Sequence, residues 1–395
     1  MKLQIRKFKN NLKDMDKILL VVVLIMVLYG LFNILTASSR ESVVKYNNSL
    51  YYYFKQHGIM LLVSFIGSLI IVNIPTKYYK LFAPIGLFII LALLFYTAFW
   101  GIDVRGSRNW MNLFGKRIQP SEFSKPILIV AMAIMFELFR KIFKSKDIKK
   151  RYFVIFAIIW GTAIAMATFI LLQRDFGTMV IVMFIFGIMF IGSPISKEDK
   201  IKTITTIFVL CVLAVGVIYI KKGELFSAEQ LDRIQDFSRP CQNYESGGYQ
   251  ICNGFIALND GGLMGLGIGD SKQKYSYIPD PHTDSVFAII GEELGLLKSS
   301  LIFIGYIIIL YRILKIASKS STVRGRYICI GVAAYLFIHV FINLGGVLAV
   351  IPFTGVPLPF FSYGGTFTIS LLCSLAMVER VAIENKNKRI KITNL

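Results

Sequence analysis

The sequence predicts an all-α integral membrane protein that crosses a bilayer about ten times. Two observations lead to this prediction: 55% of the 395 residues are hydrophobic, and they are gathered in long runs rather than spread in amphipathic periods. A run of roughly 20 apolar residues can cross the hydrocarbon core as a helix. A soluble chain could not leave so many apolar stretches in water. We therefore expect one transmembrane domain over residues 1–395.

The individual spans follow from the positions of the apolar runs. A basic segment, 1–17, precedes the first run, and no small-residue cleavage site follows it. We therefore expect a retained span rather than a cleaved signal peptide. The predicted spans are 18–36, 57–74, 80–100, 123–140, 152–172, 176–193, 202–220, 296–314, 326–350 and 364–383.

Lys and Arg indicate the orientation, because short basic loops stay on the cytoplasmic side. Basic clusters precede the first span and follow the fourth, sixth, eighth and last spans. Both termini, including the tail 384–395, are therefore expected in the cytoplasm. This topology accounts for the formal charge of +21, so nucleic-acid binding is not predicted. The outer segments are 37–56, 101–122, 173–175, the large loop 221–295, and 351–363.

The large outer loop is too long for a simple connector and is expected to be folded and functional. It contains Cys241 and Cys252, which could form a disulfide on an oxidising face or remain free thiols. Cys211, Cys329 and Cys373 fall inside predicted spans, where we expect them to be small core residues.

Charged groups beside apolar spans cost roughly 2.5–3.5 kcal/mol each on insertion scales, so they are the first candidates for chemistry. Glu122 and Lys125 are three residues apart and share a helical face at the start of the fourth span. Arg108 and Trp110 precede them. A helix capped by Ser121, with a structural ion pair and Trp110 as an interface anchor, explains the same pattern.

Asp175 lies between two closely spaced spans, near the membrane surface, and a helix N-cap would explain it equally well.

The segment 261–295 combines glycines with Lys272, Lys274 and Asp284, a carboxyl group that enters an apolar stretch and is a candidate base. A flexible connector would have similar glycine content. His282 is interpreted as structural, because a lone His without a second ligand at metal spacing is a weak signal. The turn-rich segment 354–366 is interpreted as a structural re-entrant or interfacial loop.

Four motifs in this order, on a plan of about ten spans, resemble the SEDS family of bacterial cell-wall polymerases, the group that contains FtsW, RodA and SpoVE. The segment Gly265 to Lys274 looks closer to the FtsW and SpoVE branch, whereas Gly355 to Pro359 also suits RodA; of the three, FtsW is favoured. Nearly the whole chain is covered, and the motifs are Gln119-Pro-Ser-Glu122, Gln173 to Thr178, Gly265 to Gly295 and Pro357 to Gly365.

The resemblance implies a peptidoglycan glycosyltransferase that polymerises lipid II at the outer face of the bacterial cytoplasmic membrane. It places Asp284 at the family's essential acidic position, where a carboxylate can act as general base. It implies a class B penicillin-binding protein and other division or elongation proteins as partners. A divalent cation, Mg or Mn, is a possible cofactor. The expected substrate-binding residues are Lys125, Glu122, Arg108, Trp110, Asp175, Lys272 and Lys274.

The sequence departs from the family pattern at two places. Arg174 and Phe176 flank Asp175 where relatives usually read Pro and Leu. Asn109 occupies the position of the family's usual Arg beside Trp110, and Arg108 precedes it by one residue. Two other functions remain open on this evidence: a transporter that moves lipid II across the bilayer, and a non-catalytic scaffold for division proteins.

Overall fold

The structure, a computed structural model, describes residues 10–46, 49–104, 106–113, 115–142, 148–222, 237–244, 248–275 and 277–393. Each predicted span overlaps one long helix. In chain order these are α2 (Lys17–Lys45), α3 (Tyr52–Asn73), α4 (Tyr79–Trp100), α5 (Pro120–Ile142), α6 (Ile148–Leu172), α7 (Phe176–Ile191), α8 (Lys197–Lys222), α11 (Val286–Ser318), α12 (Val323–Val347) and α13 (Gly365–Thr393).

Among the described residues, seven helices are long and apolar enough to cross a membrane on length and composition. They are α2, α3, α4 with the short helix η1 (Thr76–Tyr78), α6, α11, α12 and α13. Helix α7 is apolar but shorter, and α5 carries Glu122, Lys125, Glu137 and Arg140. The prediction of an all-α membrane protein is confirmed.

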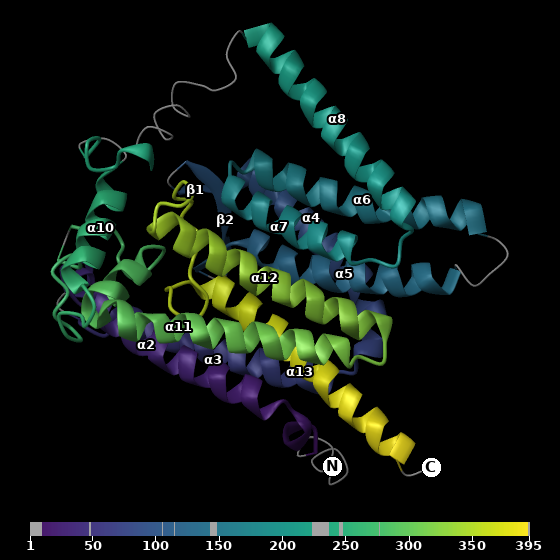
Figure 1. The fold of residues 1–395 in the computed structure, drawn as a ribbon, viewed down its shortest axis with the longest axis horizontal. Helices are drawn as coiled ribbons and strands as arrows, with labels where there is room; N and C mark the ends of the chain where they lie inside the picture. Colours follow the sequence, from purple (N-terminus) through teal and green to yellow (C-terminus); the bar gives the residue numbers. More distant parts are fainter. Residues whose placement is uncertain are drawn as a thin grey trace.

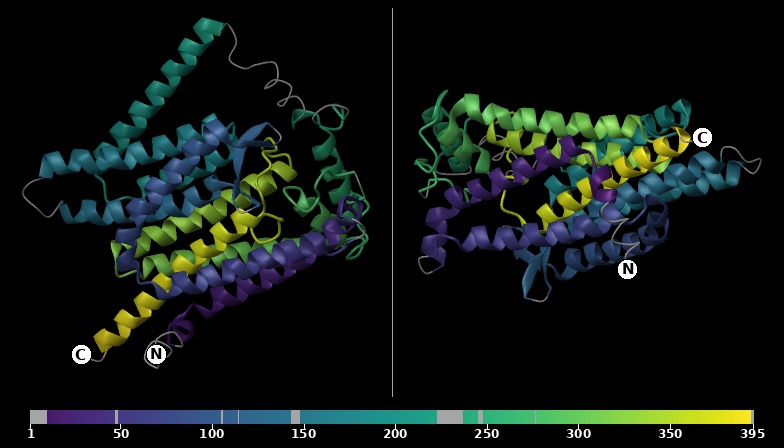
Figure 2. Two further views of the ribbon diagram at one scale, coloured as in Figure 1. Left: turned by 180° about the vertical axis from the view of Figure 1, so that it is seen from behind. Right: turned by 90° about the horizontal axis from the view of Figure 1, so that it is seen from below.

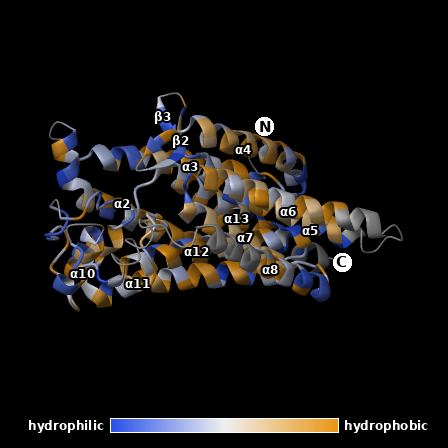
Figure 3. Ribbon diagram, turned by 90° about the horizontal axis from the view of Figure 1, so that it is seen from above, coloured by the Kyte–Doolittle hydropathy of each residue, from blue (hydrophilic) through white to orange (hydrophobic). Residues whose placement is uncertain are grey.

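The long helices lie side by side along one direction, and α8 leans away from the bundle (Figure 1). Helix α12 is central, because it packs against α5, α7, α11 and α13. Its buried residues include large apolar side chains such as Tyr335 and Leu336. Hydrophobic residues follow the helix bodies, and hydrophilic residues gather towards the ends (Figure 3). This distribution is typical of helices that are solvated by lipid.

A small antiparallel sheet interrupts the helices between α4 and α5. Its strands are β1 (Ile102–Val104), β2 (Ser107–Leu113) and β3 (Lys116–Ile118), in the order β1-β2-β3. The apolar runs place this segment outside the membrane, but its sequence pattern does not predict a sheet. Strands β1 and β3 have only three residues, too few to show an alternation of polar and apolar residues, and β2 does not alternate strictly.

The first residues of α2 and the last residues of α13 lie at the same end of the bundle. The strands and α10 (Tyr249–Gly261) lie at the other end (Figures 1 and 2). Asp14 and Lys386, from the two ends of the chain, form an ion pair of 2.7 Å. A chain whose two ends lie at the same end of a membrane bundle crosses the membrane an even number of times. The predicted topology of ten spans meets this condition.

The large loop is shorter than predicted, because α11 begins at Val286 and not near residue 296. A break at Gly295, where φ is +73°, divides the helix at the predicted boundary. The loop itself contains α10, and Cys241 and Cys252 form a disulfide there. Cys329 is buried and Cys373 is half-buried, both as free thiols. The side chain of Cys211 lies outside the described residues.

Candidate functional site

Glu122 and Lys125 form a buried ion pair at the start of α5. The Lys125 Nζ atom lies 2.7 Å and 2.8 Å from the two carboxylate oxygens of Glu122. Lys125 is fully buried and Glu122 is 3% exposed. Helix α5 begins at Pro120, which suits a first helical position, so Ser121 does not cap it. The shared helical face is confirmed, and the Ser121 cap is wrong.

His339 of α12 completes this buried cluster. Its Nε2 lies 3.1 Å from Lys125 Nζ. An ammonium group can only donate, so Nε2 accepts the hydrogen bond and the proton of the neutral ring is on Nδ1. The rings of Tyr335 and Phe367 lie 5.5 Å and 5.9 Å from Lys125 Nζ and add cation–π contacts. The charge of Lys125 is therefore compensated entirely within the protein.

Asn343, one helical turn beyond His339, connects α12 to Asp284. The Asn343 side-chain amide donates to the backbone oxygens of Asp284, at 2.7 Å, and of Val356, at 2.8 Å. Residues four apart lie above one another on a helix. One face of α12 therefore holds both the buried cation and the segment that carries the candidate base.

The Asp284 carboxyl group lies in a polar setting just before α11. Asp284 is 8% exposed, and Thr283 Oγ1 donates to its Oδ1 at 2.9 Å. A Cβ atom on Gly355 would lie 3.4 Å from Oδ2, and Gly355 has a φ of +69°. Glycine adopts this left-handed conformation without strain and lets the backbone lie against the carboxylate. The segment 354–358 therefore forms one wall around Asp284.

His282 anchors the same loop to the end of α2. Its Nδ1 lies 3.2 Å from Glu41 Oε2, and its ring centroid lies 4.2 Å from that of Tyr53. The His282 backbone oxygen accepts from the amide of Tyr363 at 2.8 Å. Lys45 adds an ion pair of 3.5 Å to Asp280. These contacts support the structural interpretation of His282.

The two acidic residues of α11 hold the glycine-rich segment in place. Glu292 accepts hydrogen bonds from Ser271 Oγ at 2.5 Å and from the Lys272 amide at 2.8 Å. Glu293 forms a buried ion pair of 3.2 Å with Lys274. Lys274 is thus held by the protein, whereas the side chain of Lys272 is exposed.

Glycines allow this segment to approach the backbone of α11. The amides of Leu266 and Gly267 donate to the Glu292 and Glu293 carbonyl oxygens, both at 3.0 Å. A Cβ atom on Gly265 would lie 2.3 Å from the Glu293 oxygen, which is too close for any side chain. The segment is a packed element and not a flexible connector.

Asp175 is the N-cap of α7 and the centre of a second network. Its Oδ1 accepts from the Thr178 amide at 3.0 Å, which confirms the cap. Its Oδ2 accepts from Asn109 Nδ2 at 2.7 Å and from Gln119 Nε2 at 3.1 Å. Asn109, which replaces the family's usual Arg, therefore points at Asp175.

Arg108 and Trp110 lie on either side of Asn109 in β2. The side chain of Arg108 is about half exposed and lies 3.8 Å from Asp103, whereas Asn109 is buried. Trp110 is half-buried and pairs with Ile102 in the sheet. The alternation of a strand sends neighbouring side chains to opposite faces. Arg108 is thereby separated from the Asp175 network.

Five of the eight predicted site residues fall into three groups, and the side chains of Arg108, Trp110 and Lys272 belong to none of them. Lys125 and Glu122 join Asp284 through α12, Asp175 has its own network, and Lys274 is paired within the loop. His339 and Asn343 were missed, although two polar residues four apart inside an apolar span are a recognisable signal. Within the described residues, no group of three or more His, Cys, Asp or Glu side chains could hold a metal ion.

Comparison with known proteins gives consistent matches over almost the full chain. Residues 16–387 match the family model named for FtsW, RodA and SpoVE and described as "Cell cycle protein". The chain is 29% identical to the probable peptidoglycan glycosyltransferase FtsW of Bacillus subtilis (strain 168), covering 96% of this chain and 95% of that protein. It is 30% identical to the probable peptidoglycan glycosyltransferase FtsW of Trichlorobacter lovleyi, covering 95% of this chain and 94% of that protein.

A sporulation protein and two solved structures are also similar. Stage V sporulation protein E of Bacillus subtilis is 28% identical, with 93% of each chain covered. One similar structure is described as "Structural coordination of polymerization and crosslinking by a peptidoglycan synthase complex". Its matching chain has a TM-score of 0.73 and 22% identity, and the match covers 94% of this chain and 98% of that chain. Thermus thermophilus RodA has a TM-score of 0.64 and 20% identity, and the match covers 93% of this chain and 96% of that chain. Both structures share this fold.

Proposed function

Because this chain belongs to the FtsW, RodA and SpoVE family of cell cycle proteins, we propose that it is a peptidoglycan glycosyltransferase that polymerises lipid II. The names of its FtsW relatives support the activity. The observation that carries the proposal is the position of Asp284. Asn343 of α12 holds the Asp284 backbone, and the segment 354–358 lies against its carboxyl group. Helix α11, which begins just after Asp284, starts at the end of the bundle where α10 lies (Figure 1).

The proposed reaction is a displacement at the donor's anomeric carbon. Asp284 takes the proton of the acceptor's 4-hydroxyl as its oxygen forms the new bond, and undecaprenyl pyrophosphate leaves with the bonding electrons. An α-linked donor becomes a β-1,4-linked glycan. A sugar hydroxyl is a poor nucleophile until its proton is removed, and a positioned base typically contributes about 10²–10⁴-fold.

The charged residues divide into a framework and candidates for substrate contact. Lys125 and Lys274 are each compensated by a glutamate, so we assign them to positioning the elements around Asp284. Lys272 and Arg108 are exposed and are the better candidates for the pyrophosphate charge. Glu122, Trp110 and Asp175 belong to the framework in this scheme. No step uses a metal ion.

We further propose that both termini are cytoplasmic and that Asp284 faces the outside. Among the described residues, basic side chains from the start of α2 and the ends of α11 and α13 converge at the end of the bundle that carries the termini, as the positive-inside rule expects. Helix α10, at the other end of the bundle (Figure 1), contains Cys252, which forms a disulfide with Cys241. Disulfides persist in oxidising compartments. This orientation places the site where the lipid-linked sugar is displayed.

A class B penicillin-binding protein, whose transpeptidase crosslinks new strands, is the proposed partner. The similar peptidoglycan synthase complex, in which polymerization and crosslinking are coordinated, supports such a pairing. Other division or elongation proteins would join the assembly in septal or lateral wall synthesis.

A lipid II transporter is the second candidate, but carriers place their polar sites near the bilayer midplane between broken helices. Here Glu122 and Lys125 lie in the first turns of α5, and Asp284 precedes α11. Incubation of the purified protein with lipid II in detergent should yield glycan strands. Transfer of lipid II across sealed vesicles without any glycan product would contradict the proposal.

A further inference from the structure

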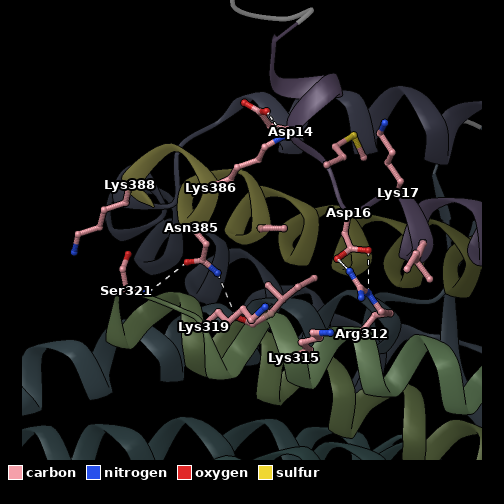
Figure 4. Close-up of a pocket in the computed structure, with 14 residues that line it drawn as sticks. Asp14, Asp16, Lys17, Arg312, Lys315, Lys319, Ser321, Asn385, Lys386 and Lys388 are labelled. Carbon is pink, nitrogen blue, oxygen red and sulfur yellow. Dashed lines mark hydrogen bonds and ion pairs between the residues drawn. The ribbon is translucent and has the colours of Figure 1, made fainter. Parts of the chain in front are cut away.

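A pocket of about 700 Å³ is lined by the first residues of α2 and the last turns of α11, at the opposite end of α11 from Asp284. Three parts of the chain line it: residues 14–18 at the start of α2, residues 312–321 at the end of α11, and residues 382–388 of α13 (Figure 4). Each part comes from a different long helix, so the pocket depends on the assembled bundle.

Positive charge dominates the lining, with six cationic side chains and two carboxylates. Both carboxylates are already paired: Arg312 Nε lies 3.1 Å from Asp16 Oδ1, and Lys386 lies 2.7 Å from Asp14. The remaining cations have no ion pair with a carboxylate of the described residues; these are Lys17, Lys315, Lys319 and Lys388.

The positive-inside rule explains lysines at this end of the bundle but not their convergence on one cavity. The adjoining segments 1–9 and 389–395 contain further Lys and Arg and neither Asp nor Glu. Glu384, within the lining stretch of α13, is already paired with Arg380. Four uncompensated ammonium groups around one cavity repel one another, and a bound anion would remove that repulsion.

The apolar part of the pocket indicates where the anion comes from. Met15, Ile18, Ile316 and Ala382 line the cavity beside the lysines. Ile18 is 51% exposed, and exposed apolar residues continue from it along α2 at Val21, Ile25 and Leu28. A lipid whose phosphate group binds in the pocket could therefore place its acyl chains along this apolar face. A soluble anion would make no contact with that face.

We propose that this pocket binds the phosphate headgroup of an anionic phospholipid from the leaflet on the side of the termini. Basic pockets between transmembrane helices are suited to such headgroups, and each Lys or Arg near the surface strengthens the attraction. The proposal concerns binding alone and holds whether or not the chain is a glycosyltransferase.

The test uses the full-length protein in detergent and a fluorescent phosphatidylglycerol as probe. Unlabelled phosphatidylglycerol should displace the probe at concentrations at least about tenfold lower than phosphatidylcholine. Equal competition by phosphatidylcholine would overturn the proposal, and this comparison needs no variant. Displacement by inorganic phosphate as effectively as by phosphatidylglycerol would mean a soluble-anion site and would also overturn it.

A matched pair of triple variants locates the site. Replacing Lys17, Lys315 and Lys319 with Gln should weaken phosphatidylglycerol binding at least about tenfold. The control replaces three exposed lysines outside the pocket, Lys77, Lys80 and Lys202, with Gln and should leave binding within about twofold of wild type. Unchanged binding by the pocket variant, or an equal loss in both variants, would contradict the proposed location.

Discussion

Individual residues in this protein show how a buried charge is kept inside a membrane bundle. Lys125 is accepted in the core because Glu122, His339 and two aromatic rings surround its ammonium group. Removing one member of a buried pair costs more than removing both, since the remaining charge has no partner. Replacing Lys125 should therefore lower the stability of the protein, whereas replacing an exposed lysine that only binds substrate should not.

Lys125→Met should lower the free energy of unfolding by about 3–5 kcal/mol, because it leaves Glu122 charged and buried. The double variant Glu122→Gln/Lys125→Met should be more stable than the single variant. Thermal unfolding in one detergent measures both. A single variant as stable as wild type would contradict this account of the pair.

Asn343 is expected to position Asp284 without touching the substrate. Asn343→Leu removes the donor that serves the Asp284 and Val356 carbonyl oxygens, and each unsatisfied buried group costs about 1–3 kcal/mol. The rate of glycan synthesis should fall while the concentration of lipid II at half-maximal rate changes little. A change confined to that concentration, with the maximal rate intact, would argue that Asn343 binds substrate instead.

At the scale of elements, the break in α11 joins the loop that carries Asp284 to the long part of the helix. The Leu296 and Leu297 amides donate to the Gly262 and Leu263 carbonyl oxygens at 2.9 Å and 3.2 Å. A Cβ atom on Gly295 would lie 2.3 Å from the Gly265 backbone nitrogen. The loop and the helix are therefore locked together at the break.

Gly295→Ala should destabilise the protein by about 2–4 kcal/mol, because it combines a left-handed backbone with overlap against backbone atoms. Gly161→Ala in α6 is the matched control, since a Cβ atom there meets nothing within 4 Å. The control should be neutral or slightly stabilising in the same thermal unfolding assay. Equal stability of the two variants would show that the break is not a close backbone contact.

The same elements show what the sequence could and could not predict. Apolar runs of membrane length located every long helix, because lipid leaves the backbone few other structures. Residues 286–294 were assigned to the loop, since Glu292, Glu293 and Gly295 look like loop residues when their partners are unknown. Their partners are Lys274, the Ser271 hydroxyl and the amides of Lys272 and Gln273, which become neighbours only in the folded chain.

The candidate site was predicted only in part for the same reason. Asp284, Glu122 and Lys125 stood out because they are charged beside apolar runs. Asn343 and His339 lie inside an apolar span, where their spacing indicates a shared face but not their partners; those depend on α12 lying between α5 and the loop. Local sequence does not distinguish an N-cap from a ligand role for Asp175, and its hydrogen bond to the Thr178 amide confirms the cap.

At the scale of the whole molecule, the account depends on the orientation of the bundle. Tyr277, in the loop before Asp284, is 51% exposed, and Lys386 near the end of α13 has a 52% exposed side chain. We expect single cysteines at these two positions, in a variant without the native cysteines, to differ in their labelling in intact cells. A membrane-impermeant maleimide should label Tyr277→Cys and leave Lys386→Cys unlabelled until the membrane is opened. The reverse pattern would place Asp284 inside the cell.

Catalysis is the central claim, and glycan synthesis by Asp284→Asn tests it most directly. Asn is similar in shape to Asp but cannot take the hydroxyl proton, so purified, folded protein should lose about 10²–10⁴-fold in polymerisation rate. Asp280→Asn, four residues earlier in the same loop, is the matched control and should remain active. Asp284→Asn protein that polymerises lipid II at the wild-type rate would contradict the account.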